Sequence, residues 1–103
     1  MMNYVSLPPM VQSAIRLNRK IVKIEWFTNR RAATCEYSKV LVEDSRGEFE
    51  NRINTWIREA YKGNWDFCRV FDITSNPELY DEECSGIRRT MKYVKRSELI
   101  QSI

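Results

Sequence analysis

Arginine and aromatic side chains are the residues of this chain whose types and spacing suit ligand binding. Arg69 stands in the middle of the aromatic stretch 65–73, and Arg88 and Arg89 follow in a later segment. A guanidinium group makes planar, bidentate contacts with phosphate, and an aromatic ring stacks on a nucleotide base. The sequence therefore predicts a site for an anionic ligand. The predicted ligand-binding residues are Trp65, Arg69, Phe71, Arg88 and Arg89.

The same stretch has a second interpretation as part of the core. By period-2 alternation, Trp65, Phe67, Phe71 and Ile73 share one face of a strand. Those rings then fill the core, and Arg69 extends to the rim or pairs with an acidic residue of segment 78–83. The alternation alone does not decide between a core and a binding surface.

Two clusters of basic residues suit contacts with a nucleic-acid backbone. Binding of this kind weakens steeply with salt, in proportion to the phosphates neutralised. The alternative is an ordinary solvated surface. The predicted backbone contacts are Arg16, Arg19, Lys20, Lys23, Lys92, Lys95 and Arg96.

The side chains that usually carry catalysis or bind metal are missing or badly spaced. The chain contains no histidine, which removes the usual general base near neutral pH and the commonest zinc ligand. Cys35, Cys68 and Cys84 are far apart, and the carboxylates do not have the spacing of a calcium loop. We therefore expect no enzyme activity, no metal and no cofactor. Free thiols and the absence of an apolar signal or membrane segment favour a cytoplasmic protein.

Charge is segregated along the 103 residues. Residues 1–39 carry seven Lys/Arg and two Asp/Glu, residues 40–83 carry five and eleven, and residues 84–103 carry five and one. If the terminal strands pair, the two basic ends form one basic surface. Alternatively, the opposite charges attract each other within the monomer. The length suits one domain, predicted as residues 10–103 after a flexible segment 1–9.

The hydrophobic pattern predicts an α+β fold with a small, strongly bent antiparallel sheet, or an SH3/Sm-like barrel, of four or five strands. We expect a short helix at 10–18, a major amphipathic helix at about 46–62, and an acidic helical turn or loop at 77–83. Ser45 and Glu48 have the spacing of a capping box, and Gly63 is placed to end the major helix in a left-handed conformation. The expected strands are 20–28, 33–43, 65–74 and 87–95, and 97–103 is either a final strand or a helical turn.

Three segments together resemble the WYL domain. Residues 14–26 look like its entry helix and first strand, residues 61–72 like its central strand, and residues 86–93 like its closing strand. The Trp-Tyr-Leu tripeptide that names the family corresponds to Trp65-Asp66-Phe67, with Asp66 in place of the tyrosine.

The resemblance implies a small Sm/SH3-like barrel similar to regulatory ligand sensors, which bind nucleotides or nucleic acid through basic and aromatic side chains. The functional prediction is accordingly a non-enzymatic regulatory module for an anionic ligand. The alternative is a small phage- or plasmid-type factor that modulates a host protein through its acidic segment 78–83 or a helix face. A homodimer is compatible with both.

Overall fold

A computed structural model of the chain describes residues 7–28, 34–82 and 90–101. Among these residues, no helix is long and apolar enough to cross a membrane. The elements are, in chain order, α1 (Pro9–Arg16), β1 (Ile21–Thr28), β2 (Thr34–Val42), α2 (Phe49–Glu59), β3 (Phe67–Asp72), the 3₁₀ helix η2 (Pro77–Asp81), β4 (Lys92–Lys95) and α3 (Arg96–Gln101).

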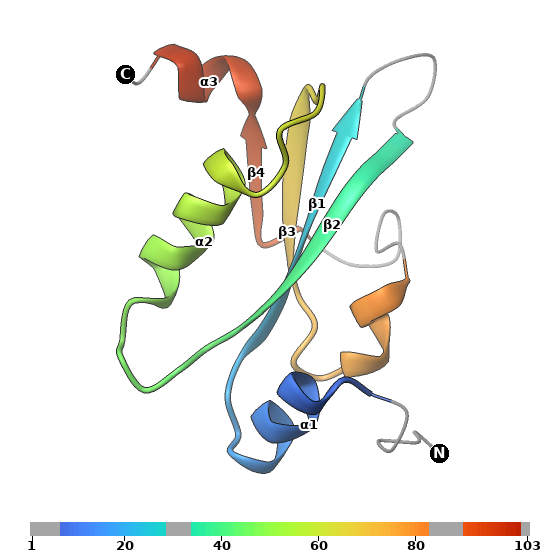
Figure 1. Cartoon of the computed structure of the whole chain (residues 1–103), viewed down its shortest axis with the longest axis vertical. Coiled ribbons are helices and arrows are strands. Elements are labelled where there is room, and N and C mark those ends of the chain that lie inside the picture. Colours follow the sequence, from blue (N-terminus) through green and yellow to red (C-terminus); the bar gives the residue numbers. More distant parts are fainter. Residues whose placement is uncertain (1–6, 29–33, 83–89, 102–103) are drawn as a thin grey trace.

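The strands form one antiparallel sheet in the order β2-β1-β3-β4. This confirms the predicted α+β class with a small antiparallel sheet. In the described part of the chain the sheet is open, with β2 and β4 at its two edges, so it does not close into the barrel that was the other option. Figure 1 shows the strongly twisted sheet, with α2 on one side of it and α1 with the neighbouring η2 on the other.

The central strand β1 is buried along its whole length. Its even-numbered residues Val22, Ile24 and Trp26 lie in the cluster beneath α2, and the odd-numbered residues face the other side. Both sides are covered, so the charged side chains of Lys23 and Glu25 are enclosed as well. The alternation of apolar and charged residues predicted this strand but not its complete burial.

The amphipathic helix α2 covers the first face of the sheet, which we call the α2 face. Ile53 and Ile57, one turn apart, are buried against the strands. The indole Nε1 of Trp26 donates a hydrogen bond to the carbonyl oxygen of Ile57 at 3.2 Å. Since a buried indole N–H needs a partner, this bond fixes the helix against β1 as well as satisfying the donor.

The ends of α2 differ from the sequence prediction. The helix begins after Glu48 without any side-chain cap, so the capping box of Ser45 and Glu48 does not form. Instead, Asp44 Oδ1 accepts the backbone N–H of Arg46 at 2.9 Å, and Gly47 takes the left-handed conformation with φ +74°. The turn therefore occupies residues that the prediction assigned to the helix. At the other end the helix stops at Ala60, and Gly63 does not have positive φ.

The Arg52 side chain has a different partner from the one that its position in the helix suggests. The sequence spacing suggests an ion pair with Glu48. In the structure the Arg52 Nη1 atom lies 3.3 Å from Asp44 Oδ2 and donates to the carbonyl oxygen of Val42 at 3.0 Å. Arg52 thereby joins the helix to the end of β2.

The second face of the sheet, which we call the α1 face, packs on α1 and η2. Its cluster contains Val11 and Ala14 of α1, Phe71 of β3 and Leu79 of η2. Leu7, which belongs to the segment 1–9 predicted to be flexible, is buried in the same cluster.

A buried ammonium group holds η2 against β1. The Nζ atom of Lys23 donates to the carbonyl oxygens of Leu79, at 3.1 Å, and of Glu82. It also lies 3.5 Å from Glu25 Oε2 within the same strand. A buried charge is tolerated where paired and hydrogen-bonded groups surround it, and Lys23 meets this condition.

Candidate anion-binding site

Three aromatic rings form a row across the α1 face, near the end of β1. Phe27 stacks on Phe67 with ring centroids 5.1 Å apart, and Phe67 stacks on Tyr93 at 5.2 Å. Strand register produces this row, because Phe27 and Phe67 are direct partners and Tyr93 lies diagonally across from Phe67 on β4. We call these three residues the ring row.

Arg69 lies over the ring row. Its guanidinium carbon is 5.4 Å from the centroid of Phe27, 5.3 Å from that of Phe67 and 6.0 Å from that of Tyr93. These distances are typical of cation–π contacts. No described carboxylate lies within ion-pair distance of this guanidinium. The rings therefore hold Arg69 in place, and they leave its N–H groups without an acid partner among the described residues.

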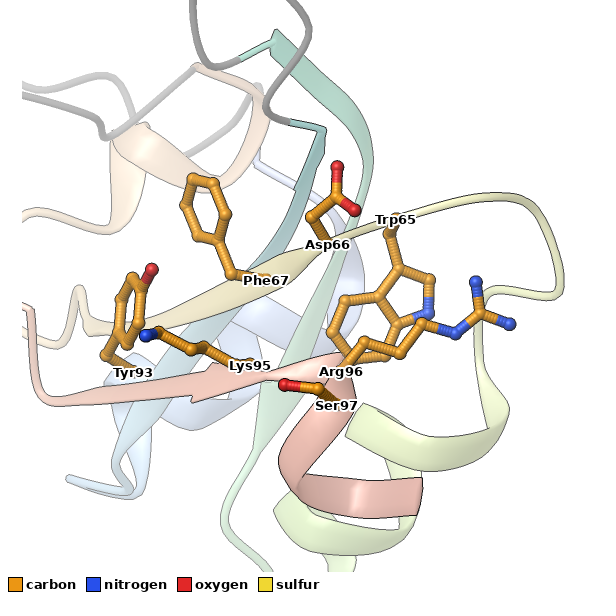
Figure 2. Close-up of a pocket in the computed structure, with 7 residues that line it drawn as sticks. All are labelled: Trp65, Asp66, Phe67, Tyr93, Lys95, Arg96 and Ser97. Atoms are coloured by element: carbon orange, nitrogen blue, oxygen red, sulfur yellow. The ribbon is translucent and has the colours of Figure 1, made fainter. Parts of the chain in front are cut away.

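A hollow of about 460 Å³ opens beside the ring row, where β3 begins and β4 meets α3. We call it the β3–β4 hollow. It is lined by Trp65, Asp66, Phe67, Tyr93, Lys95, Arg96 and Ser97. Figure 2 shows the Lys95 side chain extending toward the Tyr93 ring, while the Arg96 guanidinium lies on the other side, beside Trp65. Arg96 is 5.8 Å from the centroid of that indole ring.

The chemistry of the hollow suits a ligand that is both anionic and aromatic. Lys95 and Arg96 supply two positive charges, against one negative charge from Asp66. Tyr93 is 47% exposed, so part of this residue can be reached from solvent. Both cations belong to residues at the end of β4, and the backbone N–H of Arg96 is fixed by the carbonyl oxygen of Asp66 at 2.9 Å.

Trp65 and Phe71, the two predicted stacking residues, are not open to a ligand base. Phe71 is fully buried in the cluster on the α1 face, and Trp65 is 5% exposed in the cluster on the α2 face. The predicted common face of Trp65 and Phe67 is wrong, because the backbone bends at Asp66 and β3 begins only at Phe67. Side chains alternate between the two faces only within an extended strand, so the alternation in β3 does not predict the face of a residue before the bend.

The predicted arginine cluster is described only in part. Arg88 and Arg89 lie outside the described residues, so their relation to Arg69 stays a prediction. Arg69 itself lies on β3 among aromatic rings, as the sequence indicated.

The two basic clusters do not merge into one surface. Arg16, Arg19 and Lys20 stand at the end of α1 and before β1, whereas Lys95 and Arg96 stand beside the far end of β1. Six residues of extended strand separate these ends, about 20 Å at roughly 3.3 Å per residue. In Figure 1, α1 and the junction of β4 with α3 are at opposite ends of the molecule.

Two of the lysines predicted to contact a nucleic-acid backbone have partners within the chain. Lys23 is 2% exposed and bonded inside the molecule, so it is not available to a phosphate. The Nζ atom of Lys92 donates to Asn54 Oδ1 on α2. Of the described basic residues near the hollow, Lys95 and Arg96 are the exposed ones.

The Cys68 thiol is part of the core. Cys68 is fully buried on the α2 face, and this burial raises the pKa of its thiol to about 12 despite the opposing charge of Lys92 and a backbone hydrogen bond from Val94. A neutral, enclosed thiol is a poor nucleophile. Within the described ranges, no group of three or more His, Cys, Asp and Glu residues is arranged to hold a metal ion.

The chain matches no family model, no curated protein and no solved structure. The resemblance to the WYL domain thus stays a prediction, and the residues themselves carry the functional argument.

Sequence reasoning missed Tyr93 as a ligand-facing residue. A usable signal was present, because Tyr93 stands between Lys92 and Lys95 in a short strand next to the C-terminal end. Tyr93 and Lys95 are two residues apart, so in a strand their side chains share one face and place a ring beside a cation.

Proposed function

We propose that this chain is a non-enzymatic binding module for an anionic ligand with an aromatic ring, either a nucleotide or a nucleic-acid strand. The β3–β4 hollow is the proposed site. A half-exposed tyrosine next to the Lys95 side chain, in a hollow that Arg96 also lines, is the observation that carries the proposal.

In this proposal Tyr93 stacks on the base, and Lys95 and Arg96 contact phosphate. Stacking on an aromatic side chain contributes about 1–3 kcal/mol per base and tolerates every base, since each has a π face. The Phe67 ring and the Arg69 guanidinium both contact the Tyr93 ring, which helps to hold it in position before the ligand arrives. The free thiol of Cys68 is consistent with the proposed cytoplasmic location.

Fluorescence anisotropy with a labelled single-stranded oligonucleotide, and competition by free nucleotides, tests the proposal. Binding should be strong at low salt and weak at high salt, because cations released from the phosphates drive association. Tyr93→Ala should raise Kd about 5- to 150-fold, the equivalent of about 1–3 kcal/mol.

Lys95→Ala should weaken binding and lower the slope of log K against log salt by about 0.7 for a single strand. Arg46→Ala is the matched control, because Arg46 is an exposed cation in the turn before α2 and does not line the hollow. Equal effects of Lys95→Ala and Arg46→Ala would mean that only the overall charge attracts the ligand, and the hollow would lose its assigned role.

A further inference from the structure

The two edge strands of the sheet differ in length and in how well they are protected against pairing with another strand. The edge strand β2 has nine residues, and Glu36, Tyr37 and Ser38 in its middle are exposed. The opposite edge strand, β4, has four residues, of which two are lysines, and leads directly into α3. Short edges with lysines resist pairing with another strand, whereas long exposed edges invite it.

The hydrogen-bond pattern shows which backbone groups of β2 point away from the sheet. The N–H of Glu43 donates to the carbonyl oxygen of Lys20, and bonded positions recur at every second residue of an antiparallel pair. The backbone groups of Ser38, Val40 and Val42 therefore point outward. The carbonyl oxygen of Val42 agrees with this assignment, because it accepts Arg52 Nη1 from outside the sheet. Arg52 closes that end of the edge, and within the described ranges no hydrogen bond occupies the outward backbone groups of Ser38.

We propose that a second copy of this chain pairs with the β2 edge, antiparallel and centred on Ser38. A two-fold axis perpendicular to the sheet then places Ser38 opposite the partner's Ser38, with two backbone hydrogen bonds between them. The same register places Tyr37 directly opposite the partner's Lys39. Both residues face the α2 side of their sheets, as their pairing with Trp26 and Ile24 shows.

The side chains at these two positions are complementary. Tyr37 is 40% exposed, and its ring stacks on Tyr61 with centroids 5.3 Å apart and planes 12° apart. Lys39 extends over the ring of Trp56, with Nζ 4.7 Å from the centroid. Side chains opposite each other in a non-bonded pair are in close contact, so each Tyr37 ring gains the partner's ammonium in addition to the rings of Tyr61 and Trp26. The symmetry makes this contact twice.

A disulfide trap tests the register. In an antiparallel bonded pair the Cα atoms are about 5.5 Å apart, within the range a disulfide spans. Ser38→Cys, made in a Cys35→Ser background, should therefore form a covalent dimer under mild oxidation. Glu36→Cys is the matched control: it stands at the bulge of β2 next to Tyr37 and lies opposite the partner's Val40, so the two introduced thiols are about 13 Å apart along the strands. Equal cross-linking of both variants would overturn the register.

A charge series tests the contact itself, read by light scattering over a dilution series. Wild type should be a dimer that dissociates on dilution. Tyr37→Lys places two ammonium groups opposite each other and should give a monomer, and adding Lys39→Glu should restore the dimer. Tyr37→Lys also removes the stacking of Tyr37 on Tyr61 within the monomer, so melting curves should show a modest loss of stability and confirm that each variant is folded. A wild type that is monomeric at every concentration, a dimer insensitive to Tyr37→Lys, or a failed rescue would each refute the proposal.

Discussion

Removing the buried ammonium of Lys23 should destabilise the fold more than any change of an exposed lysine. In Lys23→Met, a side chain of similar length replaces the cation, so the change is mainly electrostatic. The carbonyl oxygens of Leu79 and Glu82 lose their donor, and Glu25 loses a neighbouring cation 3.5 Å away inside the protein.

The expected loss in the free energy of unfolding is about 3–5 kcal/mol, the range for breaking a buried pair by removing one partner. Domains of this size have a total stability of about 5–15 kcal/mol, so the loss is a large fraction. At about 4–8 °C per kcal/mol, the melting temperature should fall by at least about 12 °C.

Urea unfolding followed by tryptophan fluorescence measures this loss. Lys20→Met is the matched control, because Lys20 is a more accessible lysine three residues away and makes the same change of charge and shape. It should change stability by less than about 0.5 kcal/mol. A double-mutant cycle of Lys23→Met with Glu25→Gln should give a coupling energy of about 1 kcal/mol or more. If the two methionine variants unfold alike, the buried ammonium of Lys23 does not hold η2 against β1.

Three smaller effects follow from the core thiol and from the turn before α2. Burial in the folded state raises the pKa of Cys68 to about 12, so the thiol of the unfolded chain loses its proton at a lower pH. The free energy of unfolding should therefore fall as the pH rises from about 9 toward 12, by up to about 1.4 kcal/mol per pH unit. In urea unfolding, Cys68→Ala should lack this part of the pH dependence. Ser45→Ala should leave the melting temperature unchanged because no capping box forms, whereas Asp44→Ala should cost about 0.5–1 kcal/mol in the same melts. Gly47→Ala should cost about 1 kcal/mol, because its φ of +74° is unfavourable for a residue with a Cβ atom; a variant as stable as wild type would show that the turn can change its conformation.

The sequence predicted the elements in which apolar residues recur on one side, because that side packs against the core. The stripe that contains Ile53 and Ile57 predicted α2, and the alternation of Val22, Ile24 and Trp26 predicted β1. It did not predict that Lys23 is buried, because its covering partner η2 lies more than fifty residues later in the chain. Local periodicity contains no information about such a distant element.

Errors at the candidate site have the same physical origin. The spacing of two residues predicts that Trp65 shares a face with Phe67. Because the backbone bends at Asp66, Trp65 instead packs on the α2 face. Tyr93 was overlooked because its importance depends on Phe67 and Arg69, which pair with β4 across the sheet. A strand neighbour can be identified from the sequence only when the strand order is known, and this order places β3 between β1 and β4.

The central position of β1 divides the molecule into parts of different protection against hydrogen exchange. Amides of β1 are paired on both sides with every residue buried, so they should exchange only when the whole domain unfolds. Amides of the two edge strands need only a local opening. A nucleotide at β4 or a second copy at β2 would therefore each slow exchange along a different edge, and one deuterium-labelling experiment would distinguish the two events while β1 serves as the internal reference.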